Sequence, residues 1–242
     1  MTTLRDPLPP TAPRGAPTSS VEPGSGSAGG LSSGGSGGSG ARAGGARGAG
    51  ERVVLDDVAI RRALMRIAHE LVERNESLEP LYLVAIPNGG VPLARRIAAN
   101  LAEIAGVEVP VGILDTTLYR DDLVASGERP PLRRTEMPSA VDGRVVVLVD
   151  DVVSTGRTIR AAMDALMDFG RPRAVQVVGL VDRGHRELPI RIDYVGKNLP
   201  TRRGERVELR GLAGGLEGPL EVVVHGEPPA GAEDATGPGE GA

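Results

Sequence analysis

The sequence predicts an α/β fold with a mostly parallel sheet flanked by helices. Short runs rich in Val, Leu and Ile occur at residues 81–86, 145–149 and 175–181, as expected for strands buried on both faces. Segments with helical spacing of apolar residues separate these runs, and this alternation is typical of parallel sheets. Two adjacent acids and a Thr-Gly turn follow the second run, at the place where open α/β sheets bind ligands.

The first half of the predicted core begins with an amphipathic helix. Asp56 or Asp57 is suited to its N-cap, and one apolar face follows, formed by Ile60, Leu64, Ile67 and Leu71. After the strand at 81–86, a Pro-Asn-Gly-Gly turn leads into a helix over 92–104 and a strand over 107–114. Residues 116–138 are polar, aperiodic and long for a connection, which indicates a functional lid.

The second half of the core continues the alternation of strands and helices. The strand at 145–149 leads through the two acids to a helix over 159–169, and the strand at 175–181 comes next. Shorter strands are predicted near 192–195, 207–209 and 220–224.

Composition divides the chain into three parts. Residues 1–50 contain 14 Gly, 8 Ser and 6 Pro, so residues 1–51 are predicted to form a disordered arm. Residues 52–225 are predicted to form one domain, and the acidic, Gly/Pro-rich residues 226–242 a disordered tail. The chain has no cysteine and no apolar run of signal-peptide or membrane-spanning length, which favours a cytoplasmic protein without membrane contact. Its net charge of −4 excludes a globally basic nucleic-acid binder, although residues 183–206 are locally basic.

The residues after the 145–149 strand suit a phosphorylated sugar. Asp150 and Asp151 offer carboxylates to hydroxyl groups or to a metal ion. Residues 155–158, with the sequence Thr-Gly-Arg-Thr, lie where the next helix begins, and free N–H groups and the helix dipole attract an anion there. On this motif alone, an unrelated α/β protein whose acid pair caps a helix or binds Mg²⁺ is an alternative.

This segment resembles the signature of the type I phosphoribosyltransferases, which bind phosphoribosyl pyrophosphate (PRPP). Other segments resemble the PyrR family of bifunctional pyrimidine-operon regulators and uracil phosphoribosyltransferases, namely residues 60–64, 66–70, 118–123, 181–191 and 193–198. The resemblance covers nearly all of residues 52–225. It implies a type I phosphoribosyltransferase-like fold with a small hood, a homodimer, and conversion of uracil and PRPP to UMP and pyrophosphate with Mg²⁺. It also implies UMP-responsive binding to the mRNA leader of a pyrimidine operon.

The resemblance implies roles for individual residues. Asp150 and Asp151 would be catalytic and bind Mg²⁺, Arg120 would act from the lid, Arg183 would lie near the pyrimidine, and the backbone of Val195 would pair with its polar edge. The implied substrate-binding residues are Asn88, Gly89, Tyr119, Arg120, Asp150, Asp151, Val152, Val153, Ser154, Thr155, Gly156, Arg157, Thr158, Arg183 and Val195. The implied RNA-binding residues are Arg66, His69, His185, Arg186, Arg191 and Lys197.

One position departs from the family pattern. The loop that receives pyrophosphate usually carries Thr-Arg-Gly, whereas this chain has Asn88, Gly89 and Gly90. A charged hydrogen bond contributes about 1.5–3 kcal/mol, so its loss weakens PRPP binding. A second hypothesis is therefore a catalytically weak, UMP-sensing RNA-binding regulator, in which Gly89→Arg would raise turnover. A purine phosphoribosyltransferase is a third alternative, and residues 182–191 argue against it.

Overall fold

The structure is a computed structural model that describes residues 50–87, 89–121 and 131–226. The predicted arm and tail fall almost entirely on residues outside these ranges, as does Asn88. No helix in the described ranges is long and apolar enough to cross a membrane.

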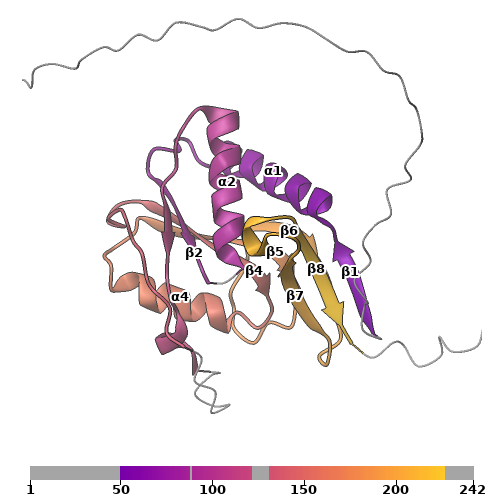
Figure 1. Ribbon diagram of the computed structural model, residues 1–242. Helices are drawn as coiled ribbons and strands as arrows, with labels where there is room; N and C mark the ends of the chain where they lie inside the picture. The colour runs from indigo at the N-terminus through magenta and orange to yellow at the C-terminus, as the bar shows by residue number, and fades with distance from the viewer. Residues whose placement is uncertain (1–49, 88, 122–130, 227–242) are drawn as a thin grey trace, which may run out of the picture. The chain divides into compact units, whose positions relative to one another are not determined.

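The described residues form the strands and helices labelled in Figure 1. In chain order these are β1 (Glu51–Leu55), α1 (Asp57–Arg74), β2 (Leu81–Ala85), α2 (Gly90–Ala105), β3 (Val111–Ile113), the 3₁₀ helix η1 (Thr117–Tyr119), β4 (Val145–Val153), α4 (Arg157–Met167), β5 (Ala174–Asp182), β6 (Tyr194–Asn198), β7 (Arg206–Gly211), the 3₁₀ helix η2 (Gly215–Glu217) and β8 (Leu220–His225).

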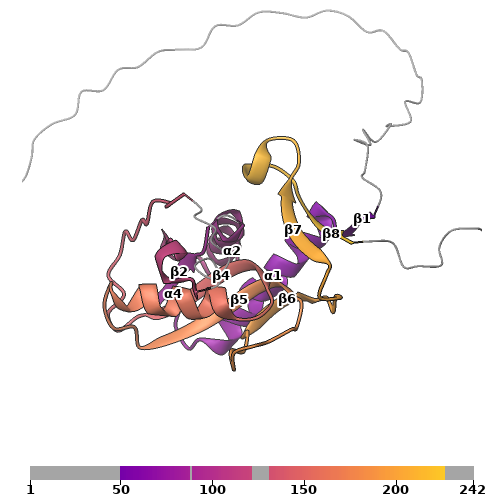
Figure 2. The same ribbon diagram turned by 90° about the horizontal axis from the view of Figure 1, so that it is seen from below.

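The central sheet has five strands in the order β3-β2-β4-β5-β6, and every neighbouring pair is parallel. Both faces are covered. Leu81 and Leu83 of β2 pack in the core cluster that contains residues of α1 and α2, whereas Tyr82 and Val84 pack with residues of α4. Figures 1 and 2 show α4 on one side of the sheet and α1 and α2 on the other. This arrangement confirms the predicted α/β fold and explains why the strand sequences are continuously apolar.

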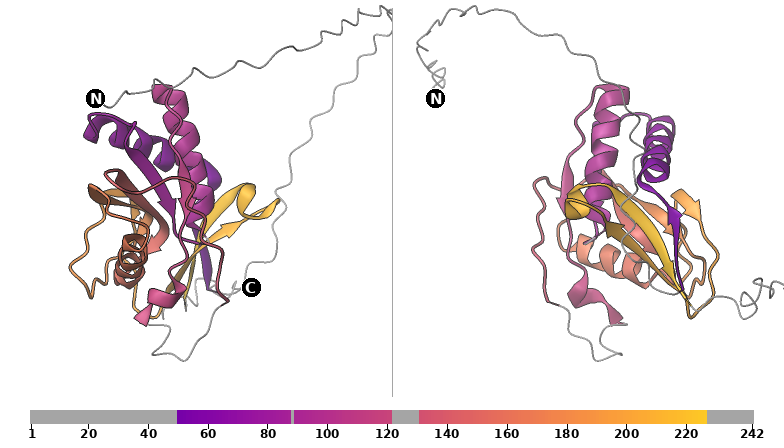
Figure 3. Two further views of the ribbon diagram at one scale, coloured as in Figure 1. Left: turned by 90° about the vertical axis from the view of Figure 1, so that its left-hand side faces the viewer. Right: turned by 45° about the vertical axis from the view of Figure 1, so that its right-hand side comes forward.

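A second, smaller sheet is antiparallel, with the order β1-β8-β7. β1 and β8 come from opposite ends of the described chain and lie side by side in Figure 3. Apolar residues of β7 and β8, including Val207 and Val222, join the core cluster on the α1 side. β1 is not among the predicted strands, because its pairing partner β8 lies about 170 residues away in the chain and leaves no local signal.

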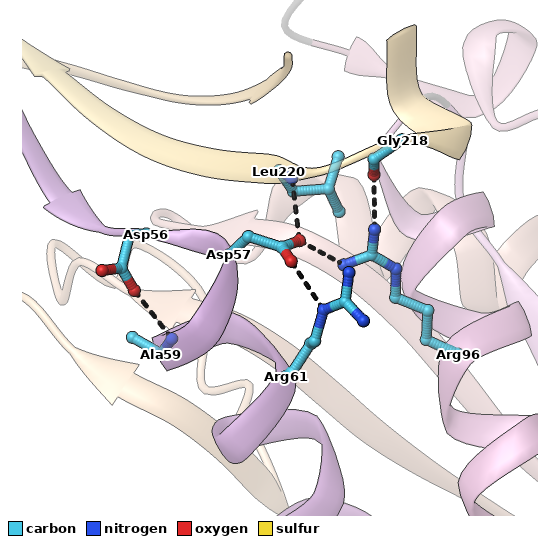
Figure 4. A network of polar contacts seen from close by, with 7 residues as sticks. All are labelled: Asp56, Asp57, Ala59, Arg61, Arg96, Gly218 and Leu220. Carbon is cyan, nitrogen blue, oxygen red and sulfur yellow. Dashed lines mark hydrogen bonds and ion pairs between the residues drawn. The ribbon is translucent and has the colours of Figure 1, made fainter. Parts of the chain in front are cut away.

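The start of α1 is held by both acids that the sequence suggested as caps (Figure 4). Asp56 is the N-cap and accepts a 2.8 Å hydrogen bond from the Ala59 N–H. Asp57 accepts from the Leu220 N–H at 3.0 Å and from Arg61 and Arg96 at 2.6 and 3.1 Å. Burial acts to raise the pKa of Asp57, but these three donors outweigh it and lower that pKa. Asp57 therefore ties α1, α2 and β8 together.

Two element boundaries near the site differ from the sequence prediction. β4 continues beyond residue 149 to Val153, because Asp150 still pairs with Gly179 and Val153 with Asp182 on β5. α4 begins at Arg157 and ends at Met167, two residues before each predicted boundary. The acid pair therefore lies within the last part of a strand, where its backbone is fixed by the sheet.

Candidate active site

A cavity of about 490 Å³ opens at the carboxyl end of β4. It lies at the edge of the sheet where parallel α/β folds bind ligands. Its lining combines acidic, basic and hydroxyl side chains with backbone groups of the β4–α4 turn. The lining residues are Pro87, Arg120, Asp150, Asp151, Val152, Val153, Ser154, Thr155, Gly156, Thr158, Ile159, Arg183, Arg206 and Val207.

The acid pair forms one wall of this cavity. Asp150 is only 5 % exposed and accepts a 3.0 Å hydrogen bond from the Asp151 N–H. Asp151 in turn accepts from the Val152 N–H at 3.0 Å. Burial, followed by the adjacent Asp151 charge, raises the pKa of Asp150 well above its usual range, and burial also raises the pKa of Asp151. A ligand that brings hydroxyl donors or a cation would stabilise the charged forms of these two buried carboxylates.

The turn between β4 and α4 forms a second wall. Gly156 precedes α4 with φ of 91°, a left-handed conformation that glycine adopts without strain. The first N–H groups of α4 have no partner inside the helix and suit an anion. The Arg157 side chain is directed elsewhere, since its guanidinium pairs with Asp121 and Glu187 at 2.8 Å each. Arg157 can therefore serve an anion here only through its backbone N–H group, which donates a long 3.3 Å hydrogen bond to Thr155 Oγ1.

Three arginines line the cavity from different segments. Arg183 is held in place by 3.0 and 2.5 Å hydrogen bonds to Thr201 Oγ1 and the Glu205 carbonyl. The charge of Arg120 acts to lower the pKa of Asp150, but burial and the Asp151 charge outweigh it. Arg206 is exposed at the start of β7 and is not among the predicted site residues. In the sequence, Arg206 is only one of several cations in the locally basic residues 183–206.

Gly89 lies against the acid pair, although it does not line the cavity. A Cβ atom built on Gly89 would lie 2.2 Å from Asp151 Oδ2, closer than any real contact. In this loop conformation there is no space for any side chain at residue 89. The cation that the family carries at this position cannot be restored here without moving the loop or Asp151.

Tyr119 and Val195, which were predicted to bind substrate, lie outside the cavity lining, as do Gly89 and Arg157. The Tyr119 hydroxyl donates to Asp168, and the Tyr119 carbonyl accepts a 2.8 Å hydrogen bond from Arg160 of α4. The Val195 carbonyl accepts a 2.9 Å hydrogen bond from Arg66, and Val195 pairs with Gly179 of β5 in the sheet.

The residues predicted to bind RNA fall into two sets. Arg66, on α1, also donates to the Gly196 carbonyl at 2.9 Å, so the exposed side chains of His69 on α1 and Lys197 on β6 border this contact. In the second set, His185 Nε2 lies 2.8 Å from the Thr201 carbonyl, and Arg186 donates to the Ile190 carbonyl of its own segment and to the Ser154 carbonyl before α4. Arg191 is exposed. Arg66 thus links α1 to β6. His185 and Arg186 instead make contacts within the protein.

Comparison with known proteins agrees with this geometry. The model of the phosphoribosyl transferase domain matches residues 54–208. "Bifunctional protein PyrR" from Pelotomaculum thermopropionicum is 59 % identical over 157 residues, a match that covers 65 % of this chain and 87 % of that protein. The protein of the same name from Roseiflexus is 58 % identical over 170 residues, covering 69 % and 93 %. The chain belongs to the PyrR family.

Solved structures support the fold of this PyrR family member. Trypanosoma cruzi hypoxanthine phosphoribosyl transferase matches with a TM-score of 0.52 at 22 % identity, covering 62 % of this chain and 78 % of that one. A hypoxanthine-guanine phosphoribosyltransferase from Bacillus anthracis matches with a TM-score of 0.50 at 18 % identity, covering 62 % and 84 %. At this identity the likeness shows the type I phosphoribosyltransferase fold and not the base that is bound.

Proposed function

We propose that the chain is a uracil phosphoribosyltransferase that forms UMP and pyrophosphate from uracil and PRPP, and that it also regulates pyrimidine genes by binding RNA. The observation that carries the enzymatic half is a single cavity. It is lined by the acid pair, the anion-binding turn before α4 and three arginines. The relatives named "Bifunctional protein PyrR" support the pairing of this activity with regulation.

The cavity accounts for the ribose 5-phosphate part of PRPP and for the base that replaces pyrophosphate. The turn at Thr155–Thr158 holds the 5′-phosphate through N–H and hydroxyl groups, and Asp150 and Asp151 accept hydrogen bonds from the ribose hydroxyls. Positive charge develops on the ribose ring as the bond to pyrophosphate breaks, and the acid pair stabilises that charge. Arg183 lies on the same cavity and is fixed in position to face the pyrimidine.

The acid pair suits Mg²⁺ as part of a coordination shell that protein and substrate share, and not as a complete protein site. Carboxylate oxygens are suitable ligands, and Mg²⁺ keeps waters and substrate phosphates in its shell. The described residues contain no group of three or more metal-binding side chains. Asp150 and Asp151 would hold Mg²⁺ together with PRPP, and the ion would neutralise the departing pyrophosphate.

RNA binding is assigned to the surface around α1 and β6. Arg66 joins the two elements, and His69 and Lys197 are exposed beside it. Such side chains bind phosphates and base edges of RNA. The expected partner is the mRNA leader of a pyrimidine operon, bound in response to UMP by a homodimer that presents two such surfaces. Arg191 supplies a further exposed cation.

A catalytically weak, UMP-sensing regulator is the second candidate, and Gly89 favours it. No arginine reaches the cavity from the loop at residues 87–90, and the space beside Gly89 is filled by Asp151. The two candidates share UMP binding and differ in turnover.

The deciding experiment measures UMP formation from PRPP and Mg²⁺ with uracil, and inosinate formation with hypoxanthine in place of uracil. The enzyme proposal expects turnover with uracil alone. Tight UMP binding without turnover would select the weak regulator. Turnover with hypoxanthine would contradict both candidates.

A further inference from the structure

We propose that Arg186 is a positioning residue for the phosphate-binding turn, and that it couples this turn to the segment at residues 182–190. The inference rests on the proposed binding of a ribose 5′-phosphate at Thr155–Thr158. It assigns Arg186 to the ligand site in place of direct contact with RNA.

Arg186 bridges two segments that are 32 residues apart. Its Nη1 atom donates to the Ser154 carbonyl at 2.5 Å and to the Gly184 carbonyl at 3.2 Å. Its Nε and Nη2 atoms donate to the Ile190 carbonyl at 3.0 Å and to Asp182 at 2.9 Å. The guanidinium side chain is only 23 % exposed. A cation committed to these four acceptors is a structural link rather than a free RNA ligand.

Backbone contacts run parallel to this link. The Glu187 and Leu188 N–H groups both donate to the Thr155 carbonyl, at 3.0 and 3.2 Å. Ile190 lies against Gly156, since a Cβ atom at Gly156 would be 3.3 Å from the Ile190 Cβ atom. The carbonyls of Ser154 and Thr155 are therefore both held by the 182–190 segment.

These contacts fix the orientation of the turn. When the Ser154 and Thr155 carbonyls are held on one side, the next N–H groups at the start of α4 are directed consistently toward an anion. A phosphate that orders the turn must also order residues 182–190, which carry Arg183 of the cavity and adjoin Arg191. Through this link, bound UMP would order the segment that carries Arg183 and adjoins the exposed cation Arg191.

Geometry rather than charge is the essential property of Arg186. The planar guanidinium fork reaches Ser154, Ile190 and Asp182 together, whereas a lysine ammonium is a point charge that cannot span them. Arg186→Lys is therefore expected to behave more like Arg186→Gln than like the wild type.

The first test compares the dissociation constants of UMP and uridine by isothermal titration calorimetry. In the wild type, their ratio reports how strongly the turn recognises the phosphate. Arg186→Gln and Arg186→Lys should each weaken UMP by about tenfold and change uridine by less than about twofold. Arg173→Gln is the matched control, an exposed arginine at the opposite end of β5. An unchanged ratio in both Arg186 variants would overturn the inference.

The second test needs no ligand and so separates this inference from the proposed function. Hydrogen exchange of the Glu187 and Leu188 amides reports their bonds to the Thr155 carbonyl. Both should exchange about tenfold or more faster in Arg186→Gln, and at the wild-type rate in Arg173→Gln. Unchanged exchange in Arg186→Gln refutes the coupling. If wild type fails to bind UMP while exchange responds as expected, the proposed ligand is wrong and the link stands.

Discussion

Replacing Gly89 with alanine tests the geometry of the acid pair most sharply, because two effects of opposite sign compete. Gly89 has φ of −70° and ψ of −27°, which are helical values just before α2. In open space, alanine at such a position would stabilise the protein by up to about 1 kcal/mol. The new Cβ atom would instead lie 2.2 Å from Asp151 Oδ2 and 2.4 Å from its Cγ atom.

The clash should outweigh the gain. Asp151 is anchored by the 3.0 Å bond from the Val152 N–H, so moving its carboxylate breaks that bond. Overpacking typically costs about 1–3 kcal/mol. We therefore expect Gly89→Ala to lower the free energy of unfolding by about 1–3 kcal/mol and to weaken UMP binding by about tenfold. Gly89→Arg should lower turnover for the same reason, which reverses the gain expected from the family pattern.

The assay is urea unfolding followed by circular dichroism, with UMP titration calorimetry on the same samples. Gly204→Ala is the control, because a Cβ atom there meets nothing within 4 Å and the backbone is not left-handed. It should unfold and bind UMP like the wild type. If Gly89→Ala is as stable as the wild type and binds UMP equally well, Asp151 does not occupy this position in the working protein.

Three further substitutions test other parts of the account. Burial and the Asp151 charge raise the pKa of Asp150, so above pH ~4 the folded protein binds more protons than the unfolded chain. The stability of the fold therefore falls as the pH rises from that value through the raised pKa. Asp150→Asn should therefore raise the free energy of unfolding at pH 7, measured in urea, while UMP formation falls by about a hundredfold; lower stability would contradict this. Arg206→Ala should raise the KM for PRPP by about tenfold. The control Arg203→Ala, which changes an exposed neighbour outside the cavity lining, should have a KM close to that of the wild type. Equal KM values in the two variants would show that Arg206 is not part of the site. Asp57→Asn should lose about 1–3 kcal/mol of stability at pH 7. Because the pKa of Asp57 is lowered on folding, this contribution is present above pH ~4 and is lost as the pH falls through the lowered pKa. A stability deficit of the same size in acid would refute the network in Figure 4.

The parts of the fold that depend on local pattern could be predicted from the sequence. The cap at Asp56 and the apolar face of α1 need only neighbouring residues, and the continuous valines of β4 reflect burial on both faces. The turn at residues 155–158 could be picked out as a candidate anion site for the same reason, because its hydroxyls and glycine are contiguous with the acid pair in the chain.

Features that depend on distant segments were not predictable. Arg206 reaches the cavity only because β7 belongs to a small sheet whose other strands are β1 and β8. Arg157 pairs with Glu187 and Arg186 donates to the Ser154 carbonyl, each about 30 residues away. Their charge alone therefore indicated an anion-binding or RNA-binding role and gave no sign of these links. The space beside Gly89 likewise depends on a neighbouring strand.

The most direct measurement is a crystal structure of the protein bound to UMP. We expect the phosphate to lie on the N–H groups of Thr155–Thr158, the ribose hydroxyls on Asp150 and Asp151, and the pyrimidine beside Arg183. UMP bound elsewhere, or bound here with its phosphate away from that turn, would show that this cavity is not the ribose-phosphate site.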